Sequence, residues 1–336
     1  MRKQKLKISI AKLEDTKGIM KFMNDVWKKD HILSRNKELF LHEFQNKENL
    51  NMIIAKDSTN TIVGIFGFMY YNSCDIPDVA GSLWKIDEKV NEPLLGFKLR
   101  EYFKKNIQHN FFAAPGANLT TKPIYKYLKI NWNQMEHYYF ANSNLKKFLI
   151  AKNPLVKQIP TLKSNAIIKH LDDINEIKDF NFLENKKIVP RKDLKYVKNK
   201  FFNHPIHKYD IYTLTSNSLI KNIFICRTLF ASASSVYRIV DFYGDLEYMH
   251  EIVQFLKLYI MEHNHEYFDF VSFGLNEELL LQAGLNKLDF DDGETIIPNL
   301  FEPFVQKNSP IYCVSDKTDL EFRQFKADGD QDRPNL

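Results

Sequence analysis

Residues 82–103 constrain the fold of this chain more than any other stretch. They begin with a short apolar run around Trp84 and Ile86, which predicts a strand, and continue through a turn that contains Pro93. Gly96 then opens a run in which apolar residues recur at helical spacing. A helix that starts this way presents unpaired backbone N–H groups and the positive end of its dipole, which suits a pyrophosphate group. An ordinary strand-to-helix turn is the alternative interpretation.

The segments on both sides of this stretch form an ordered series of strands and helices. Upstream, the pattern predicts an apolar helix at residues 19–27 and two strands at residues 51–55 and 61–71. Downstream, it predicts a strand, a short helix around Tyr125 and a further strand at residues 133–140. The series indicates one complete α/β lobe in the first part of the chain.

This series, which covers residues 6–141, resembles the GNAT acyltransferase family, in which the fourth strand leads into a loop for the pyrophosphate of acyl-CoA. The family's Arg/Gln-x-x-Gly-x-Gly/Ala loop falls on residues 91–96, where only Gly96 matches the pattern. The family's helix tyrosine falls on Tyr125 and its asparagine on Asn118. The order of elements therefore carries the resemblance, and it implies an acyl-CoA site formed by Trp84, Ile86, Asn91, Leu94, Leu95, Gly96, Lys98 and Asn118.

From residue 165 onward the order of elements repeats, including a long amphipathic helix at residues 247–262. We therefore expect a tandem GNAT-like acyl-CoA N-acyltransferase fold of the α/β (α+β) class, with mixed central sheets flanked by helices. The N-terminal lobe, with the acyl-CoA site, is expected at residues 1–145, and a linker or crossover at residues 146–164. Residues 165–336 are expected to form the C-terminal lobe, with a substrate-binding or structural role.

The second lobe carries Gly244 and Asp245 where a pyrophosphate loop would fall. An acidic residue at that point would repel phosphate. We therefore expect acetyl-CoA, as co-substrate, to bind to the first lobe.

Acyl transfer from a thioester to an amine needs a neutral amine, stabilisation of the oxyanion and a proton for the leaving thiolate. The resemblance implies that Tyr125 is the acid near the sulfur, and neighbouring Tyr127 could exchange roles with it. His31 is the best candidate for the base because imidazole titrates near neutrality. Asp87, Glu136, His137 and a water chain remain alternatives for the base.

Other residues are candidates for binding the acceptor. In the GNAT arrangement the segment with Trp27 and His31 lies over the acceptor site, although Trp27 could equally be a core anchor. His204 belongs to a loop that could lie at the substrate cleft. Arg227 and Arg238 could bind a sugar-nucleotide diphosphate in a bidentate way, although a solvated sheet face explains them as well.

Composition limits the other possibilities. A net charge of +5 is spread along the chain without a basic stripe, so we expect no nucleic-acid partner. No apolar run approaches the roughly 20 residues that cross a bilayer, and no secretory segment precedes the first strand, so we expect a cytoplasmic protein without a membrane partner. We expect no metal site, because the three cysteines are widely spaced. The two histidines His204 and His207 have no further Cys/His cluster to complete a set of ligands. The oligomeric state stays open.

The tail at residues 328–335 and the segment at residues 27–40 are similar to stretches of two-lobed GNAT-type proteins encoded with bacterial surface-polysaccharide enzymes. This resemblance implies an N-acetyltransferase that acts on the amine of a nucleotide-linked, dTDP-bearing amino-deoxysugar for lipopolysaccharide or O-antigen synthesis. An aminoacyl-transferase of the peptidoglycan-bridge type and a non-catalytic sugar-nucleotide-binding module are the alternatives. A disordered acidic end is the alternative for the tail.

Overall fold

A computed structural model describes residues 6–160, 164–316 and 318–335 of the chain. Contacts within the structure divide the chain into two compact units. Unit 1 comprises the described parts of Met1–Pro115, Pro190–His207 and Arg333–Leu336, and unit 2 comprises those of Gly116–Val189 and Lys208–Asp332. The units therefore do not follow chain order, unlike the lobe boundaries that the sequence predicts.

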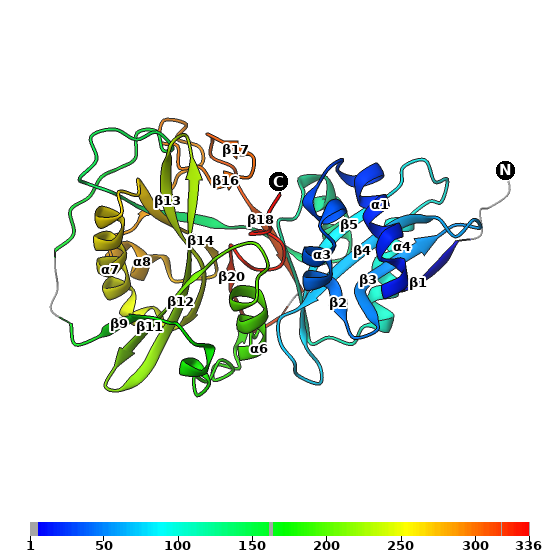
Figure 1. Cartoon of the computed structure of the whole chain (residues 1–336), viewed down its shortest axis with the longest axis horizontal. Helices are drawn as coiled ribbons and strands as arrows, with labels where there is room; N and C mark the ends of the chain where they lie inside the picture. The colour runs from blue at the N-terminus through cyan, green and yellow to red at the C-terminus, as the bar shows by residue number, and fades with distance from the viewer. Residues whose placement is uncertain (1–5, 161–163, 317, 336) are drawn as a thin grey trace. The chain divides into compact units, whose positions relative to one another are not determined.

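Unit 1 is built on a twisted sheet with the strand order β1-β3-β4-β5-β6, and β2 pairs with β3 (Figure 1). Its strands are β1 (Lys7–Lys12), β2 (Gln45–Asn46), β3 (Asn49–Lys56), β4 (Ile62–Tyr70), β5 (Asp78–Ile86) and β6 (Phe111–Pro115). Its helices are η1 (Leu13–Asp15), α1 (Thr16–Phe22), η2 (Met23–Trp27), α2 (Ile32–Arg35), α3 (Lys37–Phe44), α4 (Leu95–Asn106), α6 (Leu194–Val197) and η5 (Lys198–Phe202).

The two faces of the unit 1 sheet bury different helices. Ile65 of β4 packs in a core cluster with residues of α1, α2 and α3. The next residue, Phe66, instead contacts the Phe103 ring of α4 at 5.1 Å between centroids. Because successive residues of a strand face opposite sides, α4 covers the face opposite α1–α3.

Unit 2 has the strand order β15-β8-β14-β13-β12-β11-β9, and β20 also pairs with β14. Its strands are β7 (Asn131–Gln134), β8 (Glu136–Ala141), β9 (Ile167–His170), β10 (Ile188–Val189), β11 (Asp210–Ser216), β12 (Leu219–Ala231), β13 (Ser234–Gly244), β14 (Tyr267–Phe273), β15 (Asn286–Lys287), β16 (Leu300–Phe301), β17 (Phe304–Val305), β18 (Tyr312–Ser315), β19 (Glu321–Phe322) and β20 (Gln324–Phe325). Its helices are η3 (Leu119–Thr121), α5 (Lys122–Tyr127), η4 (Ile174–Ile177), η6 (Leu246–Tyr248), α7 (Met249–Glu262) and α8 (Glu277–Gln282).

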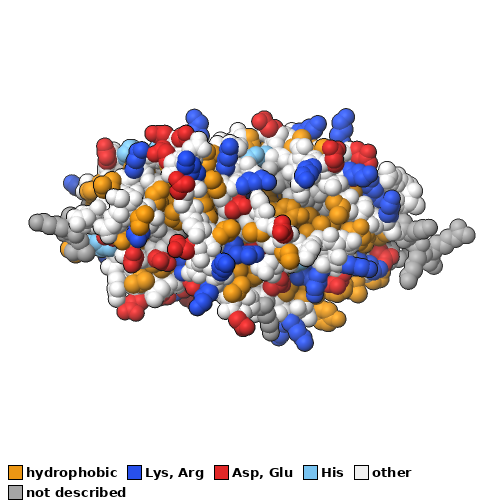
Figure 2. Space-filling view, turned by 90° about the horizontal axis from the view of Figure 1, so that it is seen from below, with side chains coloured by type: hydrophobic (Ala, Val, Ile, Leu, Met, Phe, Trp, Pro, Cys, Tyr) orange, Lys and Arg blue, Asp and Glu red, His pale blue; other side chains and the backbone are white. Residues whose placement is uncertain are grey.

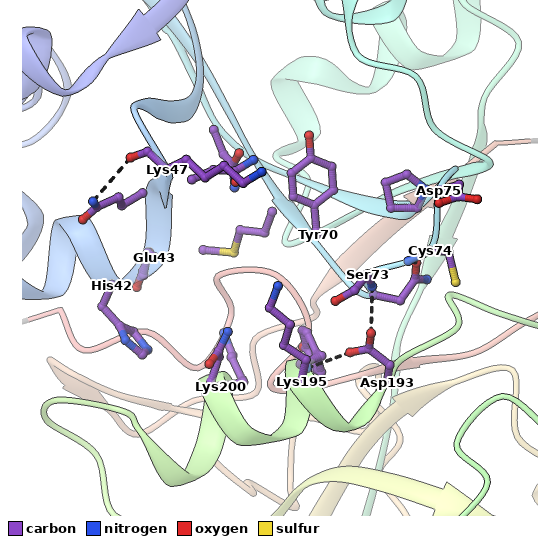
Figure 3. Close-up of a pocket in the computed structure, with 18 of the residues that line it drawn as sticks. His42, Glu43, Lys47, Tyr70, Ser73, Cys74, Asp75, Asp193, Lys195 and Lys200 are labelled. Atoms are coloured by element: carbon purple, nitrogen blue, oxygen red, sulfur yellow. Dashed lines mark hydrogen bonds between the residues drawn. The ribbon is translucent and has the colours of Figure 1, made fainter.

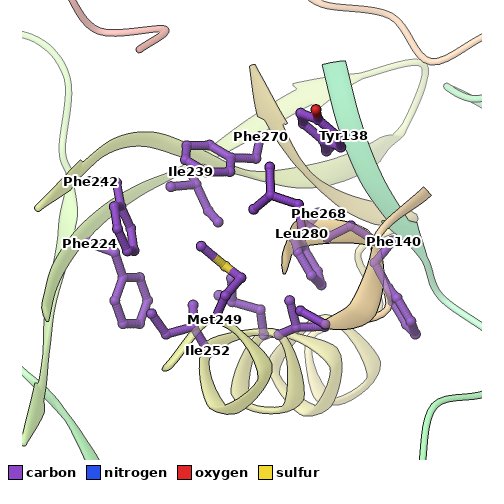
Figure 4. Packing of buried hydrophobic residues seen from close by; sticks show 14 of the residues in the cluster. Tyr138, Phe140, Phe224, Ile239, Phe242, Met249, Ile252, Phe268, Phe270 and Leu280 are labelled. Atoms are coloured by element: carbon purple, nitrogen blue, oxygen red, sulfur yellow. The ribbon is translucent and has the colours of Figure 1, made fainter. Parts of the chain in front are cut away.

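The core of unit 2 forms where α7 lies against the sheet (Figure 4). The apolar stripe that the sequence predicts for this helix is buried, from Met249 through Leu256 to Ile260. It packs in one cluster with aromatic side chains of the sheet, among them Phe224 and Phe268. The hydrophobic periodicity of the sequence therefore places this helix correctly.

The strand expected at residues 133–140 is divided between two pairings. Its first part, β7, pairs with β18, and its second part, β8, pairs with β14 and β15 in the unit 2 sheet. The single strand that the sequence predicts is therefore two strands, of which β8 pairs within the sheet of unit 2.

We predict that Leu256→Ala lowers the free energy of unfolding by about 2–5 kcal/mol, because it empties a fully buried site. Leu258→Ala on the same helix is the matched control: Leu258 is 64% exposed and should change stability by less than about 0.5 kcal/mol. Urea titration monitored by circular dichroism measures both. Equal effects of the two substitutions would contradict the packing described for α7.

Candidate functional site

In unit 1, β5 and β6 pair over a short distance and then part. They are parallel neighbours only from Asp78↔Phe111 to Ala80↔Ala113, although β5 continues to Ile86. Gly81 stands at the point of divergence, where an added Cβ would lie 2.7 Å from the Phe112 ring. The glycine is therefore needed because the two strands approach closely before they separate.

A β-bulge lies in β5 at the same point. Phe66↔Trp84 and Phe68↔Gly81 are both paired, so Ser82 and Leu83 together oppose the single residue Gly67. A bulge leaves one residue outside the regular ladder and turns its backbone groups in a new direction. The bulge therefore falls where the two strands diverge, which is the place at which an oxyanion site would need a backbone N–H.

The helix that the sequence emphasised, α4, begins just beyond this gap. Leu94 precedes it with a left-handed φ of 61° and is 73% exposed. The carbonyl of Gly96 accepts a hydrogen bond from Trp84 Nε1 at 3.1 Å, and an added Cβ at Gly96 would lie 3.3 Å from that nitrogen. Gly96 thus lets the helix lie directly on the indole, a packing role that the sequence analysis did not include.

Other predicted cofactor residues around α4 differ in their placement. Leu95 is buried in the core and exposes almost no surface to a ligand, which corrects its predicted contact with acyl-CoA. Lys98 forms an ion pair with Glu92 of the preceding loop. Ile86 ends β5 beside Gly64, and Asn91 lies exposed in the loop before α4.

Arg100, one turn into α4, is a residue that the sequence analysis missed. It is only 5% exposed, and its guanidinium carbon lies 5.3 Å from the centre of the Phe112 ring of β6. Its Nε has no hydrogen-bond partner among the described residues. A buried guanidinium with an unsatisfied donor fits a polar or anionic ligand, so Arg100 is the best candidate for holding the phosphate-bearing part of an acyl-CoA.

Asn118 and Tyr125 belong to unit 2. The Asn118 side chain accepts the Thr120 N–H at 2.9 Å and caps η3. Tyr125 on α5 is buried, and its ring lies 6.3 Å from that of Trp132. Their roles toward acyl-CoA stay predictions.

The structure contradicts the base role predicted for His31. The imidazole is buried, and its Nδ1 accepts the Leu33 N–H at 3.1 Å, which caps α2. Its Nε2 lies 3.0 Å from Asn335 Oδ1 and must donate the proton there. Burial lowers the pKa of His31, and the Asn335 hydrogen bond only partly opposes this. Both nitrogens are engaged in holding the fold, and Trp27 packs on the same ring at 4.4 Å.

The two arginines predicted to bind a diphosphate are structural residues of unit 2. Arg238 is 1% exposed and donates to both oxygens of Asp269. Burial alone would raise the pKa of Asp269, but Arg238 and His137 hold it below its ordinary value. Arg227 donates to Asp332 at 2.8 Å. Neither the predicted diphosphate contact nor a solvated sheet face describes these side chains.

The corresponding gap in unit 2 is filled by the chain itself. Strands β13 and β14 are parallel only from Tyr237↔Phe268 to Ile239↔Phe270. Beyond this, β20 pairs with β14, and the Ala327 N–H donates to the Val240 carbonyl of β13 at 2.8 Å. Backbone occupies this gap, which supports the expectation that acyl-CoA binds to the first lobe.

A pocket of about 590 Å³ opens in unit 1 (Figure 3). It is lined by the end of α3, the β2–β3 turn, the loop between β4 and β5, and the segment with α6 and η5. The lining residues are His42, Glu43, Gln45, Asn46, Lys47, Asn51, Met69, Tyr70, Asn72, Ser73, Cys74, Asp75, Pro77, Gln108, Asp193, Lys195, Tyr196, Asn199, Lys200 and His204. Of the predicted acceptor residues, His204 lies here.

Hydrogen bonds between segments that are far apart in the sequence hold the pocket wall. Asp193 caps α6 through the Tyr196 N–H at 2.8 Å and also accepts the Ser73 N–H at 2.7 Å. Arg191 makes a bidentate pair with buried Asp78 at the start of β5. No local sequence pattern indicated that residues 190–207 join this unit, because these contacts span more than a hundred residues.

One arginine connects the pocket to the bulge. Arg333 Nε donates to both carboxylate oxygens of Glu43 in the pocket wall, at 2.9 Å to Oε1 and 2.7 Å to Oε2. Arg333 Nη2 also donates to Ser82 Oγ in the bulge at 3.1 Å. Arg333 therefore links the pocket wall to Ser82 of the bulge, and the tail is not the disordered end considered from the sequence.

Two further findings concern the described residues alone. They contain no group of three or more His, Cys, Asp or Glu side chains arranged to hold a metal ion. No helix among them has the length and apolar character needed to cross a bilayer.

Comparisons with known proteins identify the fold. No protein-family model and no curated protein sequence matches the chain. A GCN5-related N-acetyltransferase from Anabaena variabilis matches with a TM-score of 0.55 over 93% of this chain and 72% of its own, at 10% identity. An Enterococcus faecalis protein described as a probable N-acyltransferase matches with a TM-score of 0.54 over the same shares, at 11% identity.

A third match is a fungal multi-domain GH3 β-N-acetylglucosaminidase that contains a GCN5-related glucosamine N-acetyltransferase region. The TM-score is 0.55 over 94% of this chain and 38% of that chain, at 10% identity. At these identities the likeness concerns the fold. The chain has the two-lobed GNAT fold that the sequence predicted, with two similar mixed sheets flanked by helices.

We predict that Arg100→Gln weakens the binding of CoA about tenfold, because it removes the buried cation between α4 and β6. Arg35→Gln, an exposed position on α2, is the matched control and should bind CoA as the unaltered protein does. Isothermal titration calorimetry measures both affinities, and melting curves without CoA identify any loss of folding. Unchanged affinity in a folded Arg100→Gln variant would exclude Arg100 from the site.

Proposed function

We propose that this chain is a CoA-dependent N-acyltransferase that moves an acetyl group from acetyl-CoA to the amine of a nucleotide-linked amino-deoxysugar. One observation carries the proposal: the gap between β5 and β6 is free of any pairing strand among the described residues and has a bulge at its apex, whereas its counterpart in unit 2 is filled. A dTDP-linked sugar for surface-polysaccharide synthesis is the acceptor that the sequence resemblance implies.

The chemistry follows from the residues around the gap. The backbone donor at Ser82 and Leu83 would hold the thioester carbonyl and stabilise the oxyanion as the amine adds to it. A C–N bond forms and the C–S bond breaks; the amine gives up a proton to water, and the thiolate takes one up. Because His31 is engaged at both nitrogens, a water chain is the route that we favour for the amine proton.

The composition of the pocket supports a sugar as the acceptor. Apart from Asn72, whose amide is bonded to Arg191 and Cys74, five of its lining side chains are amides, which carry both donors and acceptors for hydroxyl groups: Gln45, Asn46, Asn51, Gln108 and Asn199. The fungal neighbour is named for glucosamine N-acetylation, which agrees with such an acceptor. On the face in Figure 2, basic and acidic side chains are interspersed, so this face offers no basic stripe for an aminoacyl-tRNA.

The proposal predicts acetylation of amino sugars in a defined assay. The purified protein is incubated with acetyl-CoA and a panel of dTDP- and UDP-linked amino sugars, and products are identified by mass spectrometry. We expect one added acetyl group on at least one acceptor, with release of an equal amount of free CoA thiol. Absence of product together with absence of CoA binding would refute the proposal.

The acid role proposed for Tyr125 has a matched test. Tyr125→Phe removes the phenolic proton and should lower kcat by about a hundredfold, with little change in KM. Tyr127→Phe, at a position that is 78% exposed, should leave kcat unchanged. If Tyr127→Phe causes the loss instead, the two tyrosines exchange roles.

A further inference from the structure

The acidic side chains of the unit 1 pocket differ in whether they have hydrogen-bond or ion-pair partners within the unit. Of its three carboxylates, Glu43 pairs with Arg333, and Asp193 accepts the Ser73 and Tyr196 N–H groups. Asp75 lies on an exposed loop at the pocket edge. Most of the negative charge in the lining therefore already has partners within unit 1.

The lysines of the same pocket show the opposite pattern. Lys47 comes from the β2–β3 turn and Lys195 from α6, and both amines extend into the space between these elements (Figure 3). Neither has an ion-pair partner among the described residues. Two ammonium groups that extend into one polar pocket without a direct ion-pair partner favour an anionic occupant.

The two histidines of the pocket, His42 and His204, contact each other. The rings of His42 and His204 meet edge to face at 5.5 Å. Burial lowers the pKa of His42, and nearby Lys200 lowers it further, while Glu43 opposes both. The ring of His42 is also hydrogen-bonded to the Asn199 backbone, so the histidines line the pocket without adding a cationic charge to the argument.

We infer that this pocket binds the phosphate groups of the acceptor, with Lys47 and Lys195 as the counter-charges. The inference deepens the proposed function and rests on it for the identity of the acceptor. It assigns the sugar-nucleotide diphosphate to unit 1, in place of Arg227 and Arg238, whose guanidinium groups are paired within unit 2. A pocket of about 590 Å³ is large enough for a nucleoside diphosphate or a sugar phosphate.

The position of the pocket agrees with this assignment. Glu43 in its wall is linked through Arg333 to Ser82 at the bulge, where the acyl carbonyl is expected. A sugar whose phosphates contact Lys47 and Lys195 would therefore have its amine directed toward that end of the pocket. The phosphates would anchor the acceptor and would not take part in the bond changes.

The test measures binding alone, without acetyl-CoA. Isothermal titration calorimetry of the full chain at low salt compares dTDP, inorganic pyrophosphate and uncharged thymidine. We expect dTDP and pyrophosphate to bind, thymidine to bind at least tenfold more weakly than dTDP, and both anions to lose affinity as salt is raised. If thymidine binds as tightly as dTDP, the inference is wrong.

Substitutions of the two lysines test whether dTDP binds in this pocket. Lys47→Gln and Lys195→Gln should each weaken dTDP binding about tenfold, and Lys104→Gln, an exposed lysine at the end of α4, should not. Melting curves confirm that each variant folds. A folded Lys47→Gln, Lys195→Gln double variant that binds dTDP like the control would overturn the assignment.

The outcomes for the two proposals can be separated. Binding of dTDP that depends on Lys47 and Lys195, with no acetylation of any amine, would support the phosphate site and refute the N-acyltransferase. Acetylation of a dTDP-linked amino sugar that proceeds with unchanged KM in both lysine variants would support the N-acyltransferase and refute the phosphate site.

Discussion

The separation of β5 from β6 after three paired residues is the constraint on which the rest of unit 1 depends. Strands that part leave backbone N–H and C=O groups without ladder partners, and such groups must find other partners when they are buried. Gly81 allows the strands to meet closely before they part, and the bulge at Ser82 and Leu83 redirects the backbone at that point. The gap is thus a consequence of backbone geometry, and the side chains around it only adapt to it.

The two units satisfy this constraint in different ways. In unit 2, β20 fills the space between β13 and β14, and the Phe325 ring stacks on that of Phe270 at 5.8 Å. In unit 1, β5 has no strand neighbours among the described residues other than β4 and β6. The same architecture therefore has a strand beside β14 where β13 and β14 part, and no strand among the described residues where β5 and β6 part.

The sequence predicted what depends on local patterns. The apolar stripe of α7, the strand-to-helix order around Gly96 and the tandem fold all follow from periodicity and from the order of elements. Prediction from the sequence failed where the role of a residue depends on contacts with distant parts of the chain. His31 has the right chemistry for a base but is held by Asn335, some three hundred residues away, and Arg238 is paired with Asp269 of a neighbouring strand. The pocket was missed because residues 190–207 join unit 1 only through tertiary contacts.

The central claim is that an acyl-CoA occupies the gap between β5 and β6. A crystal structure of the protein grown with saturating CoA tests this most directly. The account predicts the pyrophosphate at the start of α4 near Arg100, and the thiol-bearing arm between β5 and β6 beside the bulge. CoA bound between β13 and β14 instead, or an empty unit 1 at saturating CoA, would contradict it.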